Sequence, residues 1–91
     1  MPGCPIQITV RYADGKPAAF ASVTAFEVSR VLWWEVDKYA AATVANFEGI
    51  VKFDLTKGRK YHFVFRAGTK KGDVWKELTY CNVQMSASFP Y

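Results

Sequence analysis

The chain has 91 residues, of which 51% are hydrophobic and 16% aromatic, and its formal net charge at pH 7 is +4. This length fits a single domain spanning residues 1–91, and the apolar content excludes an intrinsically disordered chain. No apolar run approaches the ~20 residues that a membrane-spanning helix requires. The first residues lack the basic and apolar regions of a signal peptide, so we expect that any leader was removed or was never present.

The positive charge is modest and spread along the chain, with its highest density at residues 57–60 and 70–71. Charge runs of this kind are typical of solvated turns, and none of the usual nucleic-acid-binding motifs occurs in the sequence. The charge would assist contact with an anionic partner but does not by itself favour a nucleic-acid site.

The first predicted strand covers residues 6–12, in which apolar and polar side chains alternate. A turn at 13–16 follows, and Gly15 can supply the positive φ that this turn needs. Residues 17–20 are predicted to be an extended connector, because the proline that begins them cannot donate to a β-ladder. A second strand is expected at 21–28.

Residues 29–39 form the least conventional segment, with the sequence Ser-Arg-Val-Leu-Trp-Trp-Glu-Val-Asp-Lys-Tyr. The segment can extend the second strand as a long hairpin arm, or it can form a helical turn. Its β-branched and aromatic side chains favour extended structure, whereas the three alanines at 40–42 favour a helix. A third strand is expected to begin at 43–45.

Two alternating runs follow a predicted turn at 46–49. In residues 50–55 the apolar side chains share one face, and in 60–67 three aromatic side chains share another, with a short turn around Gly58 between the runs. This pattern predicts a half-buried β-hairpin over residues 46–67. Because an isolated hairpin is marginally stable in water, its aromatic face requires a second sheet.

A glycine-bracketed basic loop is predicted at 68–73, and the last two strands at 74–80 and 83–89. Seven short strands with regularly spaced turns and no convincing long helix predict an all-β, antiparallel-rich sandwich. The predicted core consists of Ile6, Ile8, Val10, Val23, Val51, Phe53, Leu55, Tyr61, Phe63 and Phe65.

The turns and core positions of this layout carry a family resemblance. The chain resembles the carboxypeptidase regulatory-like domains, a transthyretin-like group, over residues 6–68. The resemblance implies an Ig-like or prealbumin-like sandwich and says little about function. The chain departs from the family at Ala45-Asn46, where the family typically has Thr-Asp, and at the Trp33-Trp34 insertion. The segments that carry the resemblance are 14–17, 21–25, 45–49, 51–55 and 57–63.

In the resembled fold the first and last strands are edge strands that lie side by side and parallel. Cys4 and Cys81 each precede one of these strands by two residues, so the resemblance implies a Cys4–Cys81 disulfide. The alternative is two unlinked buried cysteines. A disulfide favours an oxidising setting, extracellular or at the cell surface, although the cytoplasm of a thermophile also accommodates one.

Residues with catalytic or metal-binding chemistry form no recognisable constellation. The single histidine, His62, lies on the polar face of its strand, as an ordinary surface histidine would, and one histidine excludes a multi-histidine metal site. Cys4 and Cys81 lack C-x-x-C spacing, and no nucleophile or phosphate-binding motif occurs. We therefore expect no enzyme activity and no cofactor. The acidic residues without converging spacing are Glu27, Glu35, Asp37, Glu48, Asp54 and Glu77.

The strongest candidates for binding are five aromatic residues: Phe26, Trp33, Trp34, Tyr39 and Trp75. Their ordinary role would be a small accessory core that folds the insertion over a sheet. The alternatives are a surface for another protein or a second copy, or a sugar-stacking platform. We expect a non-catalytic structural or protein-interaction module that binds through residues 29–39. A carbohydrate-binding module using Trp33, Trp34 and Tyr39, and a weakly basic nucleic-acid binder, are the alternatives.

Overall fold

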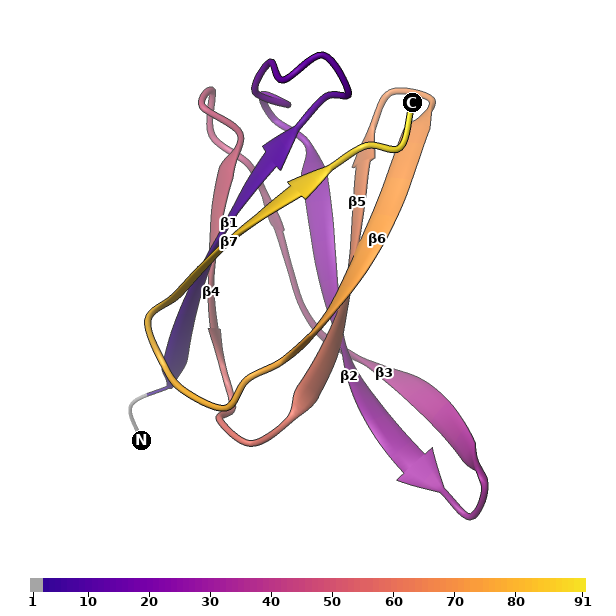
Figure 1. The fold of residues 1–91 in the computed structure, drawn as a ribbon. Coiled ribbons are helices and arrows are strands. Elements are labelled where there is room, and N and C mark those ends of the chain that lie inside the picture. Colours follow the sequence, from indigo (N-terminus) through magenta and orange to yellow (C-terminus); the bar gives the residue numbers. More distant parts are fainter. Residues whose placement is uncertain (1–2) are drawn as a thin grey trace.

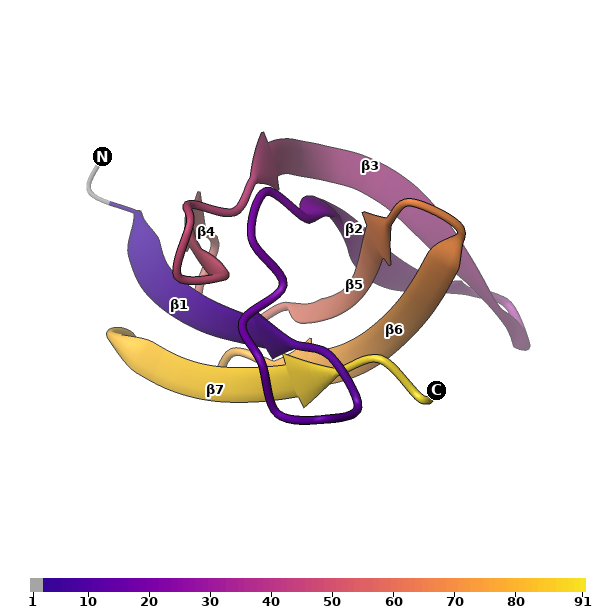
Figure 2. The ribbon, with the colours of Figure 1, turned by 90° about the horizontal axis from the view of Figure 1, so that it is seen from above.

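Seven strands lie within residues 3–91, the part of the chain that the computed structural model describes (Figure 1). Hydrogen bonds join them into a three-stranded sheet in the order β4-β1-β7 and a four-stranded sheet in the order β3-β2-β5-β6. The two sheets face each other (Figure 2), which confirms the all-β, mostly antiparallel sandwich. The strands are β1 (Cys4–Arg11), β2 (Ser22–Val31), β3 (Trp34–Val44), β4 (Ile50–Leu55), β5 (Lys60–Ala67), β6 (Lys70–Glu77) and β7 (Val83–Ser88).

The core lies between the two sheets and contains all ten side chains that the alternation predicts, each at most 7% exposed. Phe53 from the three-stranded sheet meets Phe63 from the four-stranded sheet, with their ring centroids 5.7 Å apart. Full burial of one such side chain contributes about 1.5–3 kcal/mol. The confirmed core residues are Ile6, Ile8, Val10, Val23, Val51, Phe53, Leu55, Tyr61, Phe63 and Phe65.

The β-hairpin predicted over residues 46–67 is wrong. β4 pairs with β1, whereas β5 pairs with β2 and β6, so the turn around Gly58 carries the chain from one sheet to the other. Alternation identifies the buried face of each strand but not the neighbour along its hydrogen-bonding edge. Two strands that face each other across a core therefore show the same pattern as a hairpin.

The third strand begins at Trp34 rather than at residues 43–45. Residues 29–39 are extended apart from a two-residue turn, so the extended interpretation is confirmed and the helical alternative is wrong. The alanine run is accommodated by a β-bulge. Ala25 pairs with Ala41 and Phe26 with Tyr39, which leaves one extra residue on β3 between them.

The basic loop predicted at 68–73 is mostly strand. β6 begins at Lys70, so the connection from β5 consists of Gly68 and Thr69 alone, and β6 ends at Glu77 rather than at Tyr80. β6 lies at the edge of its sheet. Charged residues, lysine above all, are common on edge strands because they discourage pairing with another chain. Lys70 and Lys71 therefore discourage another chain from pairing with this edge of the four-stranded sheet.

Cys4 and Cys81 form the predicted disulfide, with their Cα atoms 4.8 Å apart. β1 and β7 run parallel with Ile6 opposite Val83, so the two cysteines precede the paired residues by the same number of positions. The expectation that both are edge strands is wrong for β1, which lies between β4 and β7. No helix within residues 3–91 is long and apolar enough to cross a membrane.

Candidate functional site

The β2–β3 hairpin is longer than the sandwich that supports it. β2 pairs with β3 from Ser22 to Val31, but it pairs with β5 only from Ser22 to Val28. Residues 29–36 therefore form a two-stranded ribbon that projects beyond the rest of the sheet, at the lower right of Figure 1. None of the side chains described at 29–30 and 32–36 is buried, so packing against the core does not determine their type.

A tight turn closes the ribbon. Val31 pairs with Trp34, and the two residues between them make the connection. Leu32 lies in the left-handed region with a φ of 57°. A branched, non-glycine residue seldom adopts this conformation because its Cβ crowds the following carbonyl oxygen. The turn holds Leu32 and Trp33 at the outermost point of the hairpin.

Four apolar side chains gather at this end of the hairpin, which we call the apolar tip: Leu32, Trp33, Trp34 and Val36. Trp33 is 84% exposed and Trp34 49% exposed. Their rings meet edge to face, with centroids 6.2 Å apart and an interplanar angle of 79°. The two tryptophans contact each other rather than the core, so the accessory-core interpretation is wrong for them.

The other three aromatic candidates lie elsewhere, on the outer face of the four-stranded sheet. The register places Tyr39, Phe26, His62 and Trp75 in one row across β3, β2, β5 and β6. Phe26 is partly buried, whereas Tyr39 and Trp75 are more than half exposed. The five candidate residues therefore form two separate groups and not one surface.

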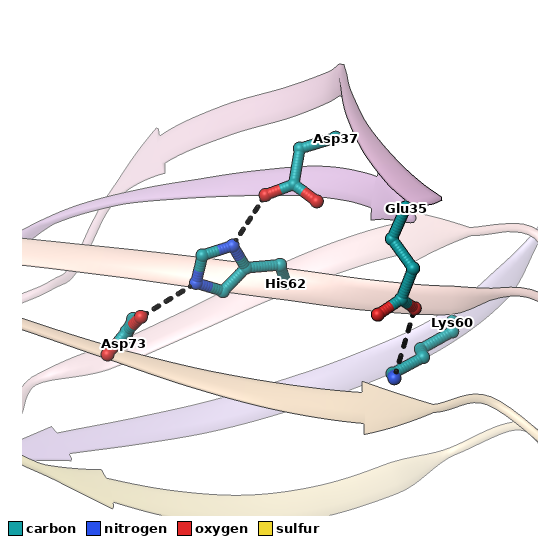
Figure 3. A network of polar contacts seen from close by, with 5 residues as sticks. All are labelled: Glu35, Asp37, Lys60, His62 and Asp73. Atoms are coloured by element: carbon teal, nitrogen blue, oxygen red, sulfur yellow. Dashed lines mark hydrogen bonds and ion pairs between the residues drawn. The ribbon is translucent and has the colours of Figure 1, made fainter. Parts of the chain in front are cut away.

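His62 is the residue that the sequence interpretation underestimated. Its Nδ1 lies 2.7 Å from Oδ2 of Asp37 on β3, and its Nε2 lies 2.9 Å from Oδ2 of Asp73 on β6 (Figure 3). The imidazole also stacks on the Trp75 indole, with centroids 4.1 Å apart and the planes within 3°. The side chain is 14% exposed. This histidine is not an ordinary surface residue but the centre of a network across the sheet.

Burial of His62 disfavours its charged form, but hydrogen bonds to Asp37 and Asp73 and their negative charges outweigh that penalty. The net effect raises the pKa of His62 above its ordinary 6.5. With a carboxylate on each ring nitrogen, neither nitrogen is free to accept a proton from a substrate. Both ring nitrogens of His62 are therefore engaged in contacts within the sheet.

The outer face also carries an open groove of about 410 Å³ beside His62, which Ser22 and Thr24 help to line. Neither hydroxyl hydrogen-bonds to the histidine, whose nitrogens are both engaged by carboxylates. Within residues 3–91 no three His, Cys, Asp or Glu side chains converge in a way that could hold a metal ion. The groove therefore lacks an activated nucleophile built around His62.

The sequence matches no known protein-family model and no curated protein. The structure itself shows a small all-β sandwich of a three-stranded and a four-stranded sheet, in which the Cys4–Cys81 disulfide links β1 to the start of β7.

Proposed function

We propose that the protein is a non-catalytic β-sandwich module of a surface or extracellular protein, and that it binds a protein partner through the apolar tip of the β2–β3 hairpin. The observation that carries this proposal is the position of Trp33 and Trp34, which are exposed at the end of a ribbon that projects past the sandwich. The disulfide is compatible with an oxidising setting. The resemblance to carboxypeptidase regulatory-like domains supports the same class of module, since it concerns fold positions rather than a catalytic site.

The tip has the composition of a binding anchor. Tryptophans are enriched among the residues that dominate binding energy, and burying such an anchor contributes roughly 2 kcal/mol or more at an interface. Exposed leucine and valine neighbours enlarge the apolar contact around the two indoles. Leaving this surface in water has no compensating gain for the fold, because the ribbon lies outside the core.

A protein partner is favoured over a sugar by the orientation of the rings. A stacking platform presents the flat faces of its rings together, but the two indoles stand at 79° to each other. Tyr39, the third member of that platform, lies on the outer sheet face beside Phe26. The three rings therefore do not share one plane. A second copy of this chain is the simplest partner, because it requires no further component.

The proposal is tested with a Trp33→Ala/Trp34→Ala double variant in analytical ultracentrifugation. We expect the parent protein to self-associate at high concentration and the double variant to sediment as a monomer, because the variant loses both anchors. The matched control is Phe47→Ala. Phe47 is 69% exposed but lies in the turn before β4, away from the tip. The control variant should sediment like the parent.

Two results would reject the proposal in this form. A parent that stays monomeric throughout the concentration range excludes the second copy as partner, and a double variant that associates like the parent excludes the tip as the contact. Titrations of the parent with polysaccharides, followed by tryptophan fluorescence, test the carbohydrate alternative. Heparin retention with a steep salt dependence would favour the nucleic-acid alternative.

A further inference from the structure

We propose that His62 is a proton-operated clamp that ties the base of the β2–β3 hairpin to the far edge of the four-stranded sheet. The clamp joins Asp37 on β3 to Asp73 on β6 through one imidazole ring (Figure 3). These are the two edge strands of the sheet, with β2 and β5 between them. This inference goes beyond the proposed binding role, because it concerns the order of the hairpin and holds whether or not the tip docks.

The position of Asp37 makes the clamp relevant to the ribbon. Asp37 pairs with Val28, which pairs in turn with Lys60. This is the last row of the sheet in which β5 still supports β2, and the strands beyond it are held only by each other. A contact that fixes Asp37 therefore fixes the point at which the free ribbon leaves the sandwich.

The clamp requires the imidazolium form. A neutral imidazole carries one N–H donor, whereas two carboxylates face its two nitrogens, and a carboxylate donates no hydrogen bond when it is ionised. Loss of the ring proton leaves one nitrogen lone pair opposite a carboxylate oxygen. Whichever nitrogen keeps its proton, the continuous bridge from β3 to β6 is broken.

No second histidine and no free cysteine lies near the clamp. His62 is the only histidine of the chain, and both cysteines are in the disulfide. The ion pair between Lys60 and Glu35, with Nζ and Oε2 3.5 Å apart, also braces the ribbon. Besides the two clamp carboxylates, Lys60 and Glu35, the charged residues that the register places on the same outer face are Arg30, Arg66, Lys71 and Glu77.

The direction of the pH effect follows from the raised pKa of His62. A group whose pKa is higher in the folded than in the unfolded protein stabilises the fold fully below its unfolded pKa, which is about 6.5 for histidine. The contribution is lost as the pH rises through the folded value. The ribbon is therefore braced by the clamp in mildly acidic solution and loosened in alkaline solution.

The test is an NMR titration of the His62 ring combined with amide hydrogen exchange between pH 5.5 and 9. We expect the amides of residues 29–36 to lose protection through the pH at which His62 loses its proton. The loss, after correction for intrinsic exchange, is at most about tenfold for each unit by which the carboxylates raise the pKa. Amides of β1, on the opposite sheet, serve as the internal reference and should show no such step.

An Asp37→Asn variant removes the proton dependence while preserving the size of the side chain. An asparagine amide can accept from a protonated ring nitrogen or donate to an unprotonated one, so the variant's contact persists in both states. We expect a lower pKa of His62 and no pH step in ribbon protection. Asp73→Asn should lower the pKa in the same way, which keeps the test valid if one variant fails to fold.

Glu35→Gln is the matched control, because it breaks the ion pair with Lys60 on the same ribbon but leaves both His62 contacts in place. This variant should keep the pH step. The clamp is ruled out if His62 titrates at or below 6.5 in the parent, or if ribbon protection stays constant while the ring titrates. Sedimentation of the tryptophan variant reports separately on docking, so either proposal can fail alone.

Discussion

Asn46 and Gly49 show how single residues decide the turn that leads into β4. The Asn46 side-chain oxygen accepts hydrogen bonds from the backbone N–H groups of Glu48, at 2.8 Å, and Ile50, at 3.0 Å. Gly49 has a φ of 78° and accepts a hydrogen bond through its carbonyl from the N–H of Val10, at 2.8 Å. The asparagine closes the turn locally, and the glycine lets the turn approach the backbone of β1.

We predict that Gly49→Ala lowers the free energy of unfolding by about 2 kcal/mol or more, because it combines left-handed strain with a steric clash. A Cβ at this position would lie 2.5 Å from the Val10 carbonyl oxygen. Gly15→Ala is the control, since Gly15 has a φ of 89° but nothing within 4 Å of the added Cβ. Urea unfolding should show a smaller loss for Gly15→Ala, and equal losses would mean that the clash is relieved at no cost.

At the scale of the strands, the β2–β3 hairpin combines a regular body with a strained turn. Along most of the hairpin β2 and β3 pair regularly, and one β-bulge accommodates the alanine run. Its turn places a leucine where glycine, asparagine or aspartate is ordinary. Strained backbone persists where the surroundings hold it and often accompanies a functional segment. The strained Leu32 and the two exposed tryptophans, Trp33 and Trp34, are three consecutive residues.

We predict that Leu32→Gly stabilises the hairpin by up to about 1 kcal/mol, since glycine adopts a φ of 57° without the Cβ penalty. Trp33→Gly is the matched control, because Trp33 is not in the left-handed region and gains nothing from the exchange. Its effect on the hairpin should be destabilising. Native-state hydrogen exchange of residues 29–36 measures the effect of each variant. If Leu32→Gly destabilises the hairpin, the contacts of the leucine side chain stabilise it by more than the left-handed backbone strain destabilises it.

The strands could be predicted where apolar and polar side chains alternate, as in β1, β4 and β5. Their neighbours could not, because alternation does not specify which edges pair, and so the hairpin over residues 46–67 was wrong. The tryptophans could be named as candidates, but their exposure depends on how far β5 extends beside β2. His62 was missed because its partners lie 25 and 11 residues away and meet it only through the pairing of four strands.

At the scale of the whole molecule, the last strand is held at both ends. The Cys4–Cys81 disulfide fixes the start of β7 beside β1. Phe89, which follows the strand, is 2% exposed, and its ring stacks on Tyr12 with centroids 5.5 Å apart. β7 has only one hydrogen-bonded neighbour in its sheet. These two anchors compensate for the missing second neighbour and keep the three-stranded sheet over the core.

We predict that removing the disulfide with Cys4→Ala/Cys81→Ala lowers the free energy of unfolding by on the order of 4 kcal/mol in the loop-entropy account. The bridge joins residues 77 positions apart, so its loss frees nearly the whole unfolded chain. Small domains are stable by only about 5–15 kcal/mol, which makes this a large fraction of the total. Urea unfolding of the double variant and of the chemically reduced parent should give similar losses, because both lack the same covalent link. A reduced parent that unfolds at the same urea concentration as the oxidised one would show that β7 is held by Phe89 and strand pairing alone.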